Sequence, residues 1–132
     1  MNDIFIGLIT SSLLIVFLEI FKSFDKRLIA ALTLVGIAFI YVGFAWNDLF
    51  SLGIVILGVL IFTTLAYFGY TYKFNFIVLG LILHGLWDLI YPLFSLTSPK
   101  GYDKFCLTVD FVLAIYFYSR TSKKVKNIVA QK

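Results

Sequence analysis

Charged side chains are scarce in this sequence, and their scarcity decides its class. Only 14% of the 132 residues are charged, whereas 61% are hydrophobic and the mean hydropathy is +1.00. A soluble domain is ordinarily about one quarter charged and about half apolar. Because a chain of this length cannot bury so much apolar surface in a core of its own, the composition excludes an ordinary soluble domain. It predicts a protein whose natural solvent is the lipid bilayer.

Cysteine is nearly absent as well. Cys106 is the only one, so no disulfide can form within the chain, and cysteine usage does not indicate a redox compartment. The first residues, Met1-Asn2-Asp3, lack the positive charges of a signal peptide, so we expect the first apolar segment to be kept as a membrane span. The Lys and Arg residues stand at the ends of apolar segments rather than in one patch, which excludes a nucleic-acid-binding surface.

Five apolar segments follow one another along the chain. A helix needs about 20 apolar residues to cross the hydrocarbon core of a bilayer. The sequence therefore predicts an all-α fold, a single transmembrane domain over residues 1–132 built as a polytopic bundle of five transmembrane helices. The expected spans are residues 4–21, 28–46, 49–72, 74–94 and 105–119, and a basic tail follows over residues 120–132.

The basic residues are unevenly shared between the two sides of such a bundle. Five crossings put nine of them on one side and only Lys100 and Lys104 on the other. Because Lys and Arg accumulate on the cytoplasmic side, we expect a multi-pass protein of the cell membrane, with its N-terminus outside and its tail in the cytoplasm. The tail fixes this topology, or in addition rests on anionic lipid. The nine are Lys22, Lys26, Arg27, Lys73, Arg120, Lys123, Lys124, Lys126 and Lys132.

Three ionisable residues are predicted at similar depths in the outer half of the membrane. Asp88 stands six residues before the end of segment 74–94, and Asp110 stands five residues after the start of segment 105–119. At helical rise, both lie about 8–9 Å below the outer boundary. His84, the only histidine, lies one turn deeper on the helix face of Asp88. Ionisable residues within spans are rare and usually face a cavity or a partner helix, so we expect His84, Asp88 and Asp110 to point into one cavity as a candidate catalytic group.

Other polar and aromatic residues are expected to surround this group and to orient a substrate. Their positions follow from the same helical spacing and depth. They are Tyr41, Asn47, Trp87, Tyr91 and Cys106. Glu19 falls at the opposite, cytoplasmic side, where we expect it to reach the membrane interface or to pair with Lys22 or Lys26. Gly36 and Gly43, seven residues apart, predict a close helix crossing.

The polar group allows three hypotheses about function. Two carboxylates held close in a low dielectric share a proton, which an imidazole can take or return. This suits an intramembrane acid–base enzyme, of isomerase or cyclase type, whose partner is a membrane lipid or other lipophilic small molecule and which needs no cofactor. It also suits a proton or ion carrier, which five short spans would form as a homo-oligomer. The third hypothesis is an accessory subunit in which the group only links helices.

A metal at this group stays an open question, because one histidine is a weak metal signal.

Two motifs carry a resemblance to a known family. Residues His84-Gly85-Leu86-Trp87-Asp88 match the pattern His-x-x-Trp-Asp, and Cys106 with Asp110 matches Cys-x-x-x-Asp. In these motifs, and in Asn47, the chain resembles a family of small bacterial membrane proteins catalogued only as a domain of unknown function.

The family often carries a His-His pair where this chain has Tyr91 and Pro92. The resemblance therefore implies the site, but neither a histidine-rich metal centre nor a reaction. A more distant analogy links the chain to the five-span sterol isomerases related to emopamil-binding protein. Those enzymes also use a histidine and a carboxylate four residues apart inside the membrane, and the likeness is one of architecture and chemistry alone.

Overall fold

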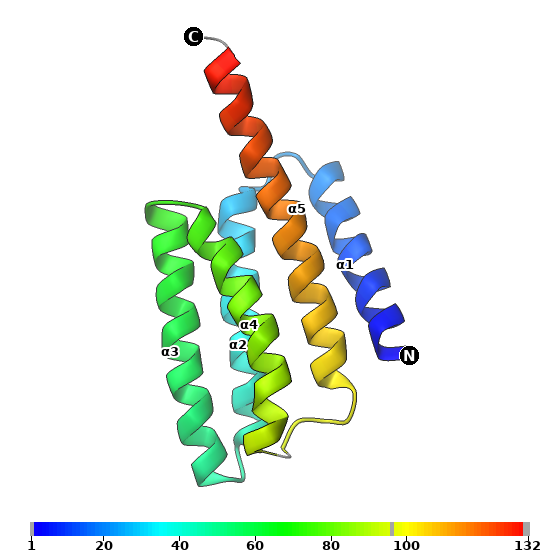
Figure 1. Cartoon of the computed structure of the whole chain (residues 1–132), viewed down its shortest axis with the longest axis vertical. Coiled ribbons are helices and arrows are strands. Elements are labelled where there is room, and N and C mark those ends of the chain that lie inside the picture. Colours follow the sequence, from blue (N-terminus) through cyan, green and yellow to red (C-terminus); the bar gives the residue numbers. More distant parts are fainter. Residues whose placement is uncertain (1, 96, 131–132) are drawn as a thin grey trace.

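The residues that the structure describes form a bundle of five helices (Figure 1). A computed structural model describes residues 2–95 and 97–130, apart from the side chains of residues 124, 125 and 128, and these residues contain no β-strand. Helices that follow one another along the chain run in opposite directions, so α1 begins at one end of the bundle and α5 finishes beyond the other. Helix α5 packs between α1 and α4, while α2 and α3 cover the other side of α4. The helices are α1 (Asn2–Ile20), α2 (Lys26–Ala45), α3 (Leu49–Thr71), α4 (Asn75–Phe94) and α5 (Tyr102–Ala130).

The predicted all-α class is confirmed, and helices α1 to α4 are each long and apolar enough to cross a membrane. Each of the four begins and ends within two residues of the corresponding predicted segment. Helix α5 differs, because it begins at Tyr102 and continues to Ala130, so the expected tail is largely helical. Residues 120–130 contain neither Gly nor Pro to end a helix. Lys132 and the side chain of Lys124 lie outside the described residues.

Two aspartates start the helices that follow short turns. Asp25 accepts hydrogen bonds from the backbone N–H groups of Arg27 (2.9 Å) and Leu28 (3.3 Å) at the start of α2. Asp48 accepts one from the N–H of Ser51 (3.1 Å) at the start of α3, and another from the Ser51 hydroxyl. These bonds hold the pKa of the Asp48 carboxyl below its ordinary value. Such caps satisfy N–H groups that a helix leaves free at its start.

The prediction of a close helix crossing at Gly36 and Gly43 is wrong. Both glycines are exposed, and a Cβ built at either would meet no atom within 4 Å, because that face of α2 looks away from the bundle. The tight crossings lie at other glycines. A Cβ on Gly7 of α1 would come within 2.9 Å of the Phe105 carbonyl oxygen of α5, and one on Gly85 of α4 would come within 2.8 Å of the Phe111 ring of α5.

Replacing Gly85 should therefore destabilise the bundle. We expect Gly85→Val to lower the free energy of unfolding by about 1–3 kcal/mol, because the added side chain overpacks the contact between α4 and α5. Gly36→Val is the matched control and should change stability little, since its side chain meets open space. Unfolding in mixed detergent micelles, followed by circular dichroism, measures both. Equal losses in the two variants would contradict a close crossing at Gly85.

Candidate functional site

Two hydrogen-bonded pairs form the centre of the bundle. The His84 Nδ1 atom on α4 lies 2.7 Å from Asp110 Oδ2 on α5, and the Tyr41 hydroxyl on α2 donates to Asp88 Oδ1 on α4 at 2.5 Å. His84 Nδ1 also lies 3.7 Å from Asp88 Oδ2. All four side chains are buried, with exposed fractions of 1% or less. The prediction that His84, Asp88 and Asp110 come together is confirmed.

Helix spacing and small residues bring these side chains together. His84 and Asp88 stand four residues apart on α4, and therefore share one face of it. Gly85, beside His84, allows α5 to approach so closely that Asp110 reaches the imidazole. On the α2 side, Gly80 leaves the space that the Leu34 side chain fills, since a Cβ there would lie 2.4 Å from Leu34 Cδ2. The group is thus held by three helices at once.

The same group offers four possible metal ligands. One donor atom from each of four buried side chains lies within 4.8 Å of the other three: His84, Asp88, Cys106 and Asp110. Nitrogen, oxygen and sulfur donors of these kinds bind divalent transition metals in proteins. Two carboxylates would also balance the charge of a divalent ion in a low dielectric. These residues could therefore hold one divalent cation.

Three polar atoms of the group have no hydrogen-bond partner within the described part of the chain. They are His84 Nε2, Asp88 Oδ2 and Asp110 Oδ1. A buried polar atom left without a partner costs about 1–3 kcal/mol, and native proteins have few of them. Three in one cluster leave hydrogen-bonding capacity free, which a water molecule, a ligand atom or a cation could satisfy.

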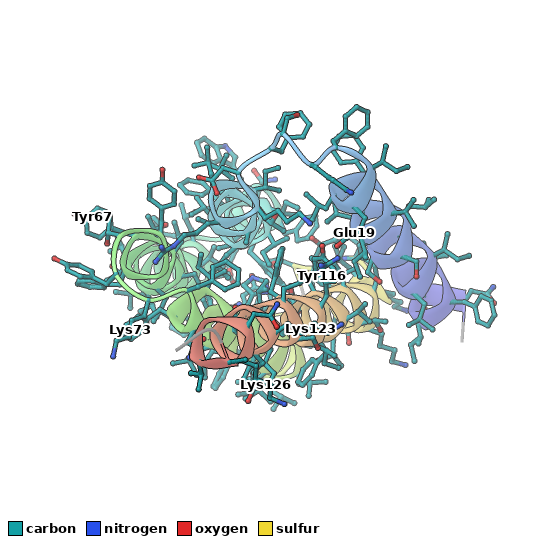
Figure 2. All side chains as sticks on the ribbon, turned by 90° about the horizontal axis from the view of Figure 1, so that it is seen from above. Glu19, Tyr67, Lys73, Tyr116, Lys123 and Lys126 are labelled. Carbon is teal, nitrogen blue, oxygen red and sulfur yellow. The ribbon has the colours of Figure 1, made fainter. Side chains whose placement is uncertain are left out.

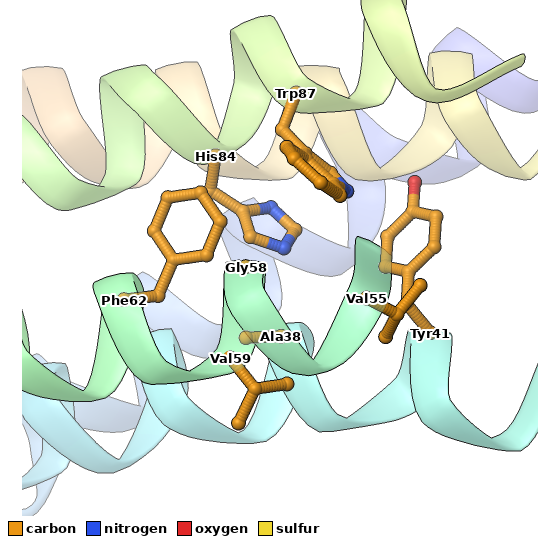
Figure 3. Close-up of a pocket in the computed structure, with 8 residues that line it drawn as sticks. All are labelled: Ala38, Tyr41, Val55, Gly58, Val59, Phe62, His84 and Trp87. Carbon is orange, nitrogen blue, oxygen red and sulfur yellow. The ribbon is translucent and has the colours of Figure 1, made fainter. Parts of the chain in front are cut away.

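The imidazole of His84 lines a narrow crevice between α2, α3 and α4 (Figure 3). The crevice encloses about 160 Å³ of free space but is too narrow to hold a water molecule. Figure 3 shows the His84 ring beside Phe62, and their centroids are 4.8 Å apart. Of the three predicted catalytic residues, only His84 lines the crevice, so the expected common cavity is not what the structure shows. The lining residues are Ala38, Tyr41, Val55, Gly58, Val59, Phe62, His84 and Trp87.

Four of the five residues predicted to orient a substrate lie at or beside this group. Tyr41 and Trp87 line the crevice, and Cys106 belongs to the donor cluster. The ring of Tyr91 packs on Tyr41, with centroids 4.8 Å apart. Its hydroxyl, however, lies 2.6 Å from Thr97 Oγ1 and so points away from the carboxylates. Tyr91 therefore supports the Tyr41 ring rather than adding a polar atom to the site.

The structure does not bring Asn47 to the site. Asn47 is exposed in the turn between α2 and α3, and six residues of helical rise, about 9 Å, separate it from Tyr41.

Sequence reasoning also missed the contribution of α3, which carries no charged residue. Gly58 and Phe62, one turn apart on α3, line the crevice. Their four-residue spacing is the only signal, and it does not by itself fix how α3 is rotated.

A second polar cluster lies at the far end of the bundle. Glu19 of α1 pairs with Lys26 of α2 (3.3 Å), as the sequence suggested. It also pairs with Arg120 of α5 and accepts a hydrogen bond from the Tyr116 hydroxyl (2.5 Å), two partners that the sequence did not suggest. Figure 2 looks onto this end and shows Glu19 and Tyr116 close together. The cluster joins α1 to the bundle through α2 and α5.

Fold and site together define a small all-α protein that has, within its described residues, four helices long and apolar enough to span a membrane and a buried His/Asp/Asp group. Residues 2–123 match the model of a family described as a family of unknown function, DUF6010, and the chain belongs to that family. The expected membership of an uncharacterised family is thereby confirmed. Neither the curated proteins nor the solved structures that were compared contain a match.

Proposed function

We propose that the chain is a multi-pass protein of the cell membrane in which α5 is the fifth crossing. Four apolar helices support this placement, and α5 lies alongside α1 and α4 over its apolar part. The uneven Lys and Arg distribution favours an outer N-terminus and a cytoplasmic C-terminus. In that orientation, the His/Asp/Asp group lies in the outer half of the membrane.

The function that the geometry supports best is acid–base chemistry on a lipophilic molecule. One observation carries it: Asp110 binds Nδ1 of His84, while Nε2 of the same ring, which lines an apolar crevice, has no partner within the described residues. A carboxylate on one imidazole nitrogen orients the ring and stabilises its charged form, so that the other nitrogen can exchange a proton with a substrate.

In this proposal, His84 Nε2 removes a proton from one substrate atom and returns it to another, as an isomerase or cyclase requires. Asp110 holds the ring and balances its positive charge during the transfer. Asp88, held by the Tyr41 hydroxyl, supplies the second carboxylate of the shared-proton group. The crevice is too narrow for a substrate as it stands, so entry requires its walls to part. Among the residues that line the crevice, Trp87 is the half-buried one and so lies nearest the surrounding lipid.

Two further functions have an observation each in their favour. An ion or proton carrier, assembled from several copies of the chain, would use the four donor side chains that lie within 4.8 Å of one another. An accessory subunit would use the two buried hydrogen-bonded pairs to link α2, α4 and α5. The three unpartnered atoms favour a site that acts on something over a purely structural link.

Filling the crevice tests the acid–base proposal without touching the acids or the base. We expect purified wild-type protein to carry a lipophilic compound, detected by mass spectrometry after organic extraction. In Gly58→Leu, whose Cβ would lie 3.3 Å from the Trp87 ring, its occupancy should fall by about tenfold, equal to about 1.4 kcal/mol of binding. Gly53→Leu is the matched control on the same helix, because a Cβ there meets no atom within 4 Å. Equal occupancy in all three proteins would contradict substrate binding in the crevice.

Elemental analysis of the same samples separates the carrier from the enzyme. A stoichiometric divalent metal that persists in Gly58→Leu but is lost in Asp110→Asn would favour the carrier, because Gly58 contributes no donor atom to the cluster. A bound lipid without metal would favour the enzyme.

A further inference from the structure

A groove with basic walls lies at the end of the bundle from which α5 projects. It has about 960 Å³ of free space and opens to the surroundings between the start of α2, the turn that joins α3 to α4, and the middle of α5. Figure 2 looks onto this end of the molecule. We call it the basic groove. Its lining residues are Asp25, Lys26, Arg27, Tyr72, Phe74, Phe117, Arg120 and Thr121.

The cationic side chains of the basic groove are held in place by neighbours. Arg27 donates from Nε to the Gly69 carbonyl oxygen at 2.9 Å, and no hydrogen bond or ion pair within the described residues engages its two terminal nitrogens. A guanidinium fixed in this way presents two parallel donors, the geometry that suits a phosphate. Lys26 and Arg120 stand on either side of one carboxylate, that of Glu19.

The charge of the basic groove favours an anion. Three cations line it; Glu19 pairs with two of them, Lys26 and Arg120, and the one carboxylate in the lining itself is that of Asp25. That carboxylate already accepts two backbone N–H groups at the start of α2. Other basic residues surround the same end, namely Lys73, Lys123 and Lys126 (Figure 2). They attract anions in general, whereas the lining residues define one position.

Apart from Thr121, the rest of the lining is aromatic. Phe74 and Phe117 pack edge to face with ring centroids 5.6 Å apart, and Tyr72 is largely exposed at the end of α3. Cations and aromatic rings together at the ends of long apolar helices match a molecule with an anionic head and apolar chains. Basic pockets between transmembrane helices at the cytoplasmic surface bind acidic lipid headgroups in this manner.

We propose that the basic groove binds the phosphate of an anionic phospholipid, with Arg27 and Arg120 as its principal ligands and the Tyr72 and Phe74 side chains against the lipid's glycerol and upper acyl carbons. The inference rests on the membrane placement in the proposed function, but not on its acid–base chemistry. The two sites lie at different depths and share no residue.

Native mass spectrometry of the full-length protein in detergent tests this binding. Dioleoylphosphatidylglycerol should bind about fivefold or more tightly than dioleoylphosphatidylcholine, and an excess of inorganic phosphate should not displace it. Arg27→Gln and Arg120→Gln should each weaken the phosphatidylglycerol complex by about fivefold, the effect of one basic residue near an anionic surface. Lys73→Gln makes the same change of charge at the same end but outside the groove, and should change affinity by less than about twofold.

Three results would overturn the inference. Equal weakening by Lys73→Gln would show diffuse attraction in place of a site. Displacement by inorganic phosphate would show a free-anion site, and equal binding of the two lipids would show no headgroup recognition. Should Arg27→Gln fail to fold, as judged by circular dichroism, Arg120→Gln carries the comparison. Recovery of wild-type protein in carbonate-washed membranes tests the membrane placement by itself, so that failure of the placement is distinguished from failure of the groove.

Discussion

Asp110→Ala should lower the free energy of unfolding by about 3–5 kcal/mol, the usual result of removing one partner from a buried ion pair. The change leaves His84 Nδ1 without its 2.7 Å partner in the middle of the bundle, where the imidazole has an exposed fraction of 0%. Asp88→Ala should also lower the free energy of unfolding, since it leaves the Tyr41 hydroxyl without its acceptor.

Replacing the whole group should have the opposite outcome. A variant that combines Tyr41→Phe, His84→Leu, Asp88→Leu and Asp110→Leu keeps similar side-chain shapes and leaves no buried polar atom of the group unpaired. We expect it to be as stable as the wild type, or more stable by up to about 4 kcal/mol, as when buried ion pairs are replaced by apolar residues. Unfolding by sodium dodecyl sulfate in mixed micelles, followed by circular dichroism, compares all the variants.

The comparison decides between a functional group and a structural link. If the combined variant lost as much stability as Asp110→Ala, or more, the hydrogen bonds would be holding the helices together. That result would support the accessory-subunit hypothesis. A stable combined variant would mean that the polar group opposes or does not improve stability. Its three unpartnered atoms already point to that result, because unpaired buried atoms destabilise the folded state.

The convergence of the polar group could be predicted from the sequence because it depends only on helical rise. Asp88 and Asp110 stand at similar distances from the ends of their segments, and the chain turns back between them, so the two carboxylates are expected at the same depth without any knowledge of the packing. His84 follows from its four-residue spacing to Asp88. The cap at Asp48 could be predicted in the same local way, from a polar turn between two apolar segments.

The rotation of each helix about its own axis could not be predicted in this way. Helix α3 is apolar on every side, so nothing in its sequence shows that Gly58 and Phe62 face the crevice. Gly36 and Gly43 looked like a crossing because they share a face, but that face is exposed, and the tight contact lies at Gly85. Which small residue marks a crossing depends on the neighbouring helix, here on Phe111 of α5. The sequence of one helix does not contain that information.

Exchange of substrate hydrogen with solvent should depend on His84 if the acid–base proposal is right. An enzyme that removes a proton from carbon onto His84, exchanges that proton with D2O when the walls of the crevice part, and then returns a deuteron introduces deuterium into its substrate. We expect wild-type protein, reconstituted with a membrane lipid extract in D2O, to label one lipophilic compound. His84→Gln should slow this labelling by about 10²–10⁴-fold, the usual contribution of a general acid–base residue, because an amide cannot shuttle a proton.

Asp110→Asn should slow the labelling by a similar factor while keeping the shape of the side chain. The amide can donate a hydrogen bond to Nδ1 of His84, and this places the imidazole proton on Nε2, the nitrogen that must accept the substrate proton. Asp103→Asn makes the same chemical change in the first turn of the same helix, away from the donor cluster, and should label at the wild-type rate. Labelling that survives in both His84→Gln and Asp110→Asn would exclude this group as the proton carrier. Labelling lost in Asp110→Asn but restored by Asp110→Glu would show that the carboxylate, rather than a single hydrogen bond, sets the state of the imidazole.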